Sequence, residues 1–189
     1  MTMTIKKKAI FLDRDGTINE DIGYEFSVEK CKILPGVIDG LKLLEEKFVF
    51  FIVTNQSGIG LGYYPVETFL EFNNYLLDKL EESGIKIVKT YCCPHARDEG
   101  CDCRKPNIKF LEEARKDFDI DVKNSWVIGD HPSDVLLGIN AGCKTVYLLT
   151  GHGASHLKDL KEKKIKPTII TDNILTAANM ILKKEKGEI

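Results

Sequence analysis

Short apolar stretches alternate along this chain with longer stretches whose apolar residues recur at helical spacing. A short apolar run bounded by turn signals is typical of a buried strand. Such runs predict strands over residues 8–12, 48–54, 85–91, 125–128, 144–149 and 168–170. The second of these, which is apolar from Phe48 to Val53, fits a strand that is covered on both faces of its sheet.

Helices are predicted between most of these strands. In the longest one, which begins at Pro65, apolar residues recur at helical spacing, and Gly84 is a suitable C-cap. Ser133 is a suitable N-cap for a helix that ends near Gly142. A helix over 175–182 closes the chain, and the charged tail beyond it is expected to fray. The other two predicted helices follow residues 34–36, with Val37, Leu41 and Leu44 on the apolar face, and cover residues 107–118.

The order of these elements predicts an α/β fold. Alternating strands and helices favour right-handed βαβ crossovers and a mostly parallel sheet with helices on both faces, which gives a three-layer, Rossmann-like architecture. A chain of 189 residues is long enough for one domain with a sizeable core and short for two. Residues 1–189 are therefore expected to form a single domain.

Composition and charge restrict the possible partners. The chain is 43% hydrophobic and 30% charged, which is typical of a globular protein, and its net charge of -2 argues against nucleic acid or a membrane surface as a partner. Residues 1–8 are basic but no apolar segment follows them, so no signal peptide is expected. The longest apolar run is far shorter than the ~20 residues of a membrane helix. We therefore expect a cytoplasmic protein with reduced thiols. A monomer is expected as well, although no feature of the sequence decides between a monomer and a dimer.

Polar side chains gather where the predicted strands end. The first strand leads into Asp13 and Asp15, the second ends in Thr54, and the fourth leads into Asp130, while Lys105 opens a helix. The carboxyl ends of parallel strands share one edge of a sheet, so these groups are expected to converge. Carboxylates suit Mg²⁺, and a lysine beside them suits a phosphate. Each motif alone is often a turn or a helix entry, but their joint occurrence predicts metal-assisted phosphate chemistry.

A cysteine-rich loop provides a second candidate site. Cys92, Cys93, Cys101 and Cys103 lie close to His95 in the sequence, and in a reducing compartment such a cluster indicates metal ligands rather than disulfides. Three thiolates and one imidazole are the composition of a closed, structural Zn²⁺ site. Such a site would fold a loop that has too few apolar residues to fold itself. Either Cys92 or Cys93 could supply the first thiolate.

Four motifs follow one another in the chain. They are Asp-Arg-Asp-Gly-Thr at 13–17, Thr-Asn-Gln at 54–56, Lys-Pro at 105–106, and Gly-Asp-X-X-X-Asp at 129–134. Together they resemble the motifs of the haloacid dehalogenase superfamily of phosphatases, and the resemblance extends over about residues 8–153.

The resemblance implies a role for each motif. Asp13 would be the nucleophile and form an aspartyl-phosphate, while Asp15 would act as general acid and then as general base. Mg²⁺ would bind Asp13, the backbone carbonyl of Asp15, and Asp130. Thr54 and Lys105 would hold the oxygens of the transferring phosphoryl group.

The zinc loop, about residues 92–104, narrows the resemblance. Its end, Cys-Asp-Cys-Arg-Lys-Pro, is similar to that of the D-glycero-D-manno-heptose-1,7-bisphosphate phosphatases and the related histidinol-phosphate phosphatases, which lack a large cap domain. Their Cys-X-His pattern favours Cys93 over Cys92, so the implied zinc ligands are Cys93, His95, Cys101 and Cys103.

Segments 19–24, 55–60 and 150–153 are similar to the heptose enzymes, which implies a phosphorylated sugar as substrate and hydrolysis at its C7 phosphate. Arg104 would recognise the distal phosphate through its planar donor fork. The residues that would line the substrate pocket are Asp21, Ile22, Gly23, Tyr24, Asn55, Gln56 and Ser57.

Three alternatives stay open. A histidinol-phosphate phosphatase fits the short spacing between His95 and Cys101, and His131 stands where the heptose enzymes usually carry a lysine. A phospho-aspartate receiver also uses an acidic cluster, a threonine and a lysine, but it needs no acid at the position of Asp15. A zinc-dependent binding module would not need Asp13. The remaining histidines, His152 and His156, are expected to lie on the surface.

Overall fold

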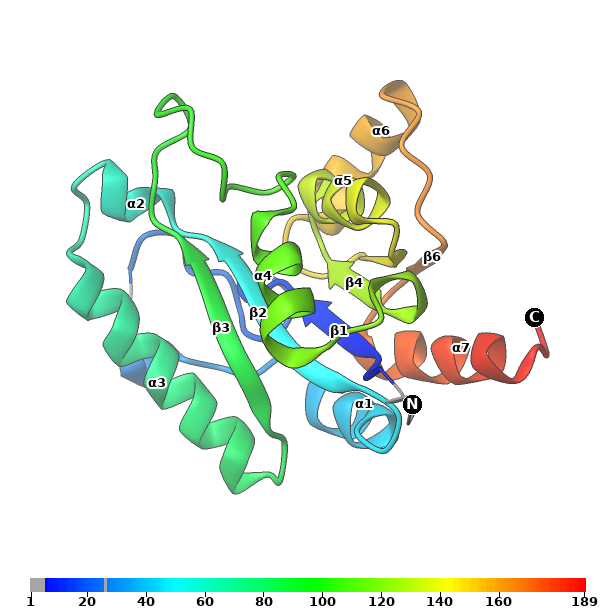
Figure 1. Cartoon of the computed structure of the whole chain (residues 1–189). Helices are drawn as coiled ribbons and strands as arrows, with labels where there is room; N and C mark the ends of the chain where they lie inside the picture. Colours follow the sequence, from blue (N-terminus) through cyan, green and yellow to red (C-terminus); the bar gives the residue numbers. More distant parts are fainter. Residues whose placement is uncertain (1–5, 26) are drawn as a thin grey trace.

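Six parallel strands form one sheet in the computed structural model, which describes residues 6–25 and 27–189 (Figure 1). Their order across the sheet is β3-β2-β1-β4-β5-β6. The first five residues, part of the segment for which no signal peptide is expected, lie outside the described residues. The strands are β1 (Ala9–Leu12), β2 (Val49–Asn55), β3 (Ile87–Cys93), β4 (Trp126–Gly129), β5 (Lys144–Leu148) and β6 (Ile169–Thr171).

Helices connect the strands and cover both faces of the sheet (Figure 1), so the predicted three-layer α/β fold is confirmed. The α-helices are α1 (Val37–Leu44), α2 (Ser57–Gly60), α3 (Val66–Glu82), α4 (Lys109–Phe118), α5 (Pro132–Ala141), α6 (Gly153–Glu162) and α7 (Ile174–Lys186). Two 3₁₀ turns, η1 (Val28–Lys30) and η2 (Val122–Asn124), complete the described structure.

The central strand β1 shows how the sheet is buried on both faces. Ile10 and Leu12 pack into a core with residues of α1, α3 and α7, whereas Ala9 and Phe11 pack into a second core with residues of α4 and α5. Successive side chains of a strand point to opposite faces, so a strand between two helical layers must be apolar throughout.

Two helix ends differ from the sequence prediction. His131, not Ser133, is the N-cap of α5: the backbone N–H of Ser133 donates to His131 Nδ1, and Asp134 Oδ2 accepts from the backbone N–H of His131. The charged tail does not fray after residue 182, because α7 continues to Lys186 and buries the Glu185 side chain between Lys8 and Lys144. The short helix α2 and the helix α6 were not predicted.

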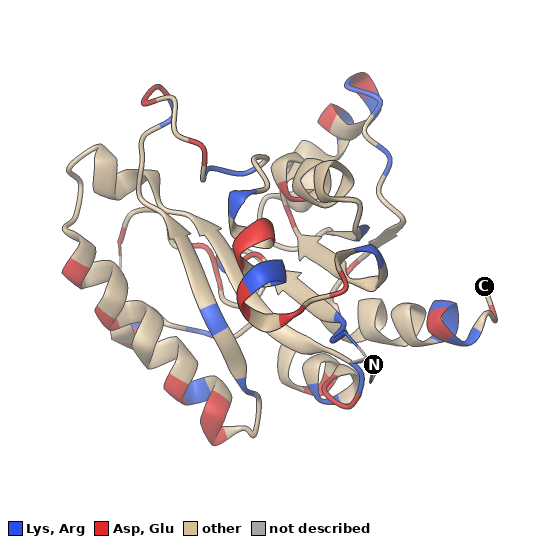
Figure 2. Ribbon diagram, viewed as in Figure 1, with Lys and Arg blue, Asp and Glu red and all other residues tan. Residues whose placement is uncertain are grey.

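Between β1 and α1, the residues that the structure describes form one 3₁₀ turn and isolated bridges, such as Asn19 to Ile33, and no cap domain. The carboxyl edge of the sheet is therefore covered by loops. Among the described residues, no helix is both long and apolar enough to span a membrane. Figure 2 shows acidic and basic residues mixed along the outer helices and the zinc loop, in keeping with the small net charge.

Candidate active site

The candidate site lies where the strand order reverses. β1 pairs with β2 on one side and with β4 on the other, and open α/β sheets bind ligands beyond the carboxyl ends of strands at such a point. The backbone N–H of Asp13 donates to the carbonyl of Ile128 at 2.9 Å, which extends the pairing of β1 and β4 and fixes where the Asp13 side chain begins.

Asp13, Lys105 and Asp134 form a chain of charges in which Lys105 and Asp134 are buried and Asp13 is half-buried. Lys105 Nζ lies 2.8 Å from Asp13 Oδ1 and 2.7 Å from Asp134 Oδ1. Asp13 Oδ1 also accepts the backbone N–H of Arg14, whereas no hydrogen bond from a described residue reaches its Oδ2. Asp13 therefore presents one oxygen that is held and one that is available to a ligand.

Burial and charge act in opposite directions on this chain. Burial raises the pKa of Asp13, and the ammonium of Lys105 works against that rise. Burial alone would favour the neutral amine of Lys105, but Asp13 and Asp134 outweigh it and raise the pKa of Lys105. Lys105 is thus held as a cation, and Asn55 fixes its backbone, because Asn55 Oδ1 accepts the Lys105 N–H at 3.0 Å.

Asp130 is enclosed by two glycines. A Cβ atom added to Gly16 or Gly151 would lie 2.4 or 2.3 Å from Asp130 Oδ2, so a side chain at either position would displace the carboxylate. The same oxygen accepts the backbone N–H of His152 at 2.8 Å. Burial raises the pKa of Asp130 to about 6, and the carboxylate of Asp134 adds to the effect.

The three carboxylates fit a divalent cation. Asp13, Asp130 and Asp134 each offer an oxygen within 4.8 Å of the others. Both oxygens of Asp134 and of Asp130 already take part in polar contacts, whereas Asp13 Oδ2 accepts no hydrogen bond from a described residue, so Asp13 offers the most available oxygen. Burial raises the pKa values of Asp13 and Asp130, and a hard cation between the two carboxylates would counteract that rise.

Asp15 is held by three side chains rather than pointing freely into solvent. Arg14 Nε and Nη2 and Asn19 Nδ2 donate to its carboxylate, and Gln56 Nε2 donates at 2.8 Å. The Arg14 guanidinium is itself fully buried between the rings of Phe69 and Phe72 on α3.

A pocket with a volume of about 340 Å³ opens above these groups. It brings together all the predicted catalytic and substrate-binding residues except Ile22, which does not line it. The predicted residues in its wall are Asp13, Asp15, Asp21, Gly23, Tyr24, Thr54, Asn55, Gln56, Ser57, Arg104, Lys105 and Asp130.

Five further residues line this pocket that the sequence did not assign to it: Tyr64, Arg97, His131, Ser133 and His152. His152, expected to be a surface residue, places Nε2 3.1 Å from Asp21 Oδ2, and His156 is half-buried with its ring 4.9 Å from that of His131. The N-capping role of His131 could have been read from the Pro132 that follows it.

The cysteine loop forms a compact cluster of possible ligands. Cys103 Sγ lies 3.2 Å from both Cys93 Sγ and His95 Nδ1, and Cys101 Sγ lies 3.6 Å from Cys93 Sγ. A tetrahedral zinc ion with Zn–S bonds of about 2.3 Å separates its ligands by about 3.6–3.8 Å. The four predicted ligands are therefore close to the spacing that such an ion needs.

Cys92 does not belong to this cluster. It is the neighbour of Cys93 on β3, so its side chain points to the opposite face of the sheet. Burial raises the pKa of Cys92 to about 12, which keeps it a neutral thiol.

Comparison with known proteins gives a consistent result. A family model described as HAD-hydrolase-like matches residues 102–177. The D-glycero-alpha-D-manno-heptose-1,7-bisphosphate 7-phosphatase of Campylobacter jejuni is 42% identical over 164 residues, which cover 84% of this chain and 94% of that relative. The D-glycero-beta-D-manno-heptose-1,7-bisphosphate 7-phosphatase of Helicobacter pylori strain 26695 is 39% identical over 163 residues, which cover 82% and 94%.

A solved structure is similar over nearly the whole chain. The crystal structure of D,D-heptose 1,7-bisphosphate phosphatase from B. bronchiseptica, complexed with magnesium and phosphate, superposes with a TM-score of 0.83 at 27% identity. The match covers 94% of this chain and 99% of that one.

Proposed function

The chain belongs to the haloacid dehalogenase-like phosphatases, in the family of the heptose bisphosphate phosphatases, and we propose that it hydrolyses the C7 phosphate of D-glycero-D-manno-heptose 1,7-bisphosphate. The proposal rests on the floor of the pocket, by which we mean Asp13, Lys105, Asp130 and Asp134. Asp13, Lys105 and Asp130 meet there in a chain that is 42% identical to a phosphatase of this substrate.

In the proposed reaction, the available Oδ2 of Asp13 attacks phosphorus while Lys105 keeps Oδ1 in place. The bond between phosphorus and the sugar oxygen breaks, and the phosphoryl group is transferred to Asp13. Lys105 and Thr54 line the pocket beside Asp13 and would bind the equatorial phosphoryl oxygens, whose charge grows in the transition state.

Asp15 would carry the proton. As an acid it would protonate the leaving sugar oxygen, and as a base it would take a proton from the water that cleaves the aspartyl-phosphate. The Asp15 carboxylate accepts hydrogen bonds from Arg14, Asn19 and Gln56. A substrate that binds beside Gln56 can take over the hydrogen bond from Gln56 and so release Asp15 for proton transfer.

Two metals complete the proposal. Asp13, Asp130 and the backbone carbonyl of Asp15 would hold Mg²⁺, which neutralises the repulsion between carboxylate and phosphate. Cys93, His95, Cys101 and Cys103 would hold a structural Zn²⁺, for which the geometry of the cluster is suitable. A thiolate site of this kind supports a reducing compartment such as the cytoplasm as the place of action.

The substrate would lie between the floor and the loops at the pocket mouth. Asp21, Gly23 and Tyr24 come from the segment after β1, and Arg104 comes from the zinc loop, where it donates to the carbonyl of His95 at 3.2 Å. That contact leaves most donors of the guanidinium for the second phosphate of the sugar.

Phosphate release from heptose 1,7-bisphosphate in the presence of Mg²⁺ tests the proposal. We expect the Asp13→Asn protein to lose at least about 10³-fold in kcat, since the nucleophile is absent. Histidinol phosphate is the matched comparison substrate, because it presents a phosphomonoester without a second phosphate. Faster turnover of histidinol phosphate, or equal activity of the Asp13→Asn protein, would contradict the proposal.

A further inference from the structure

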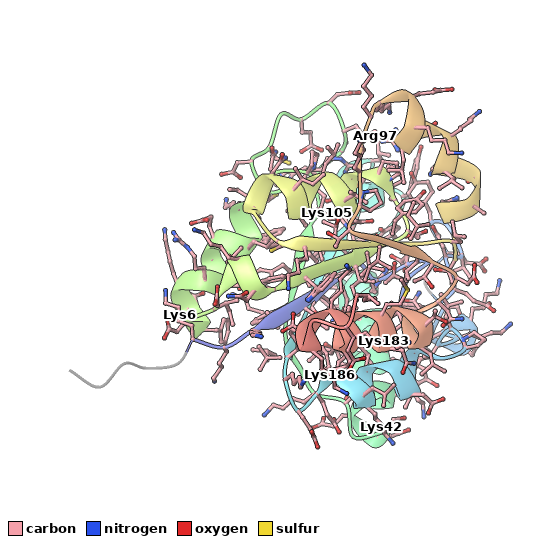
Figure 3. The ribbon with its side chains drawn as sticks, turned by 90° about the vertical axis from the view of Figure 1, so that its right-hand side faces the viewer. Lys6, Lys42, Arg97, Lys105, Lys183 and Lys186 are labelled. Carbon is pink, nitrogen blue, oxygen red and sulfur yellow. The ribbon has the colours of Figure 1, made fainter. Side chains whose placement is uncertain are left out.

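Arg97, in the zinc loop, is a pocket residue for which neither the motifs nor the catalytic floor provide a role. Its side chain is exposed, and it forms no ion pair or hydrogen bond with any residue that the structure describes. Figure 3 shows Arg97 farther out than Lys105 and on the same side of the molecule. An unpaired guanidinium at the mouth of a pocket is therefore available to a bound anion.

The backbone beside Arg97 is held from three directions. His95 belongs to the ligand cluster, Glu99 Oε1 accepts the N–H of Ala96 at 2.7 Å, and the N–H of Gly60 donates to the carbonyl of Pro94 at 2.8 Å. A Cβ atom at Gly60 would lie 2.6 Å from the Ala96 nitrogen, so α2 and the zinc loop are in close contact here. The backbone from which the Arg97 side chain extends is therefore held in place.

Arg97 also shares the pocket with α5. Arg97 lines the same pocket as His131 and Ser133, which lie at the N-terminus of α5, so the guanidinium faces a space bounded by both the zinc loop and α5. Arg104, from the same loop, lines the pocket as well and has no ion pair among the described side chains. Asp21, the acidic residue at the mouth, is instead paired with His152.

From these observations we infer that Arg97 joins Arg104, already proposed to bind the second, unreacted phosphate, in one subsite, and that Arg97 makes the enzyme select bisphosphorylated substrates. The inference rests on the proposed function and deepens it. A phosphate dianion matches two guanidinium groups in charge, and each can offer it paired donors. The reacting phosphate would bind a different cation, Lys105, which forms ion pairs with Asp13 and Asp134 at the floor of the pocket.

Calorimetric binding to the Asp13→Asn protein with Mg²⁺ separates binding from turnover. Heptose 1,7-bisphosphate and heptose 7-phosphate are compared in this background alone and with Arg97→Ala or Arg97→Lys added. We expect Arg97→Ala to reduce the preference for the bisphosphate by about 10- to 100-fold. Arg97→Lys should restore part of it, because lysine keeps the charge but loses the fork.

The matched control is Arg115→Ala, which removes an exposed arginine of α4 that pairs with Glu112 outside the pocket. It should keep the original preference. The inference is overturned if Arg97→Ala leaves the preference unchanged, if both ligands weaken equally, or if the starting protein prefers neither ligand. Arg97-dependent binding of the bisphosphate without its hydrolysis by the Asp13 protein would instead support this inference and refute the proposed function.

Discussion

At the scale of single residues, the site depends on close packing around its charged groups. Gly16 and Gly151 leave room for Asp130 Oδ2, and Lys105 occupies the space between two carboxylates. Asp130 is buried and Asp13 is half-buried, so each would be costly as an isolated charge, and a lysine or a metal must compensate them. A small displacement of the Asp130 carboxylate, such as a side chain at Gly16 or Gly151 would cause, is therefore expected to impair the site.

Gly151→Ala tests this crowding. Because the new Cβ would lie 2.3 Å from Asp130 Oδ2, we expect the carboxylate to shift and the Mg²⁺ concentration for half-maximal activity to rise by at least about 10-fold. Gly62→Ala is the control, since Gly62 also has positive φ but its added Cβ would meet no atom within 4 Å. Equal metal dependence of the two variants would contradict the account.

At the scale of elements, the zinc loop and the termini of helices decide what surrounds the site. The loop has few apolar side chains, so its shape depends on the four ligand residues and on its contact with Gly60. The loop ends at Arg104 and is followed directly by Lys105, and both residues line the pocket. Loss of the cluster would therefore disturb both recognition and catalysis.

Cys101→Ser tests the role of the cluster. We expect this variant to retain no zinc and its Tm to fall by at least about 4 °C. The binding free energy of a structural ion adds to the free energy of folding, and a loss of about 1 kcal/mol already lowers the Tm of a domain of this size by roughly 2–4 °C. Cys92→Ser, which changes the adjacent thiol on the other face of β3, should keep both. Stoichiometric zinc in the Cys101→Ser protein, measured by atomic absorption, would exclude the assigned ligand set.

The end of α7 gives a prediction for pH. Hydrogen bonds from Lys8 and Lys144 outweigh the effect of burial and lower the pKa of Glu185 below its usual value of 4.5. A folded-state pKa below the unfolded one stabilises the protein above about pH 4.5, and the benefit is lost as the pH falls through the folded-state pKa.

Glu185→Gln should therefore lower the free energy of unfolding by about 1 kcal/mol at pH 7 and have less effect at pH 3. Urea unfolding at the two pH values measures the difference. Glu188→Gln is the control, because Glu188 is exposed and lies 3.9 Å from Lys186. A Glu185→Gln effect of equal size at both pH values would refute the ion-pair explanation.

Strand ends could be predicted from the sequence, whereas contacts across loops could not. Asp13, Thr54 and Asp130 follow apolar runs, so parallel topology alone brings them together. Arg97 and His152 reach the pocket through loops whose conformation depends on the ligand cluster and on Asp130. No spacing rule in the sequence contains that information.

The missed elements have similar causes. The helix α6 buries Gly153 and Leu160 and has few other apolar residues, so no run of apolar positions marks it in the sequence. The last turns of α7 are charged, and Glu185 pairs there with Lys8, just before β1, and with Lys144 of β5. Leu, Lys and Glu favour a helix in both segments, so what the sequence lacked was a marked apolar face rather than helix propensity.

At the scale of the whole molecule, the fold separates reaction from recognition. The sheet edge supplies a buried, charged floor, and the segment after β1, the zinc loop and the start of α5 and α6 supply the mouth. Since no cap domain covers the pocket in the described structure, selection of the substrate must come from these loops. This division explains how one set of phosphatase motifs can serve a particular sugar phosphate.

The most direct test of the account is ³¹P NMR of heptose 1,7-bisphosphate incubated with the protein and Mg²⁺. We predict that the resonance of the C7 phosphate disappears, inorganic phosphate appears in equal amount, and the C1 phosphate remains. Loss of the C1 phosphate, or no change in either resonance with a protein that retains its fold, would contradict the account.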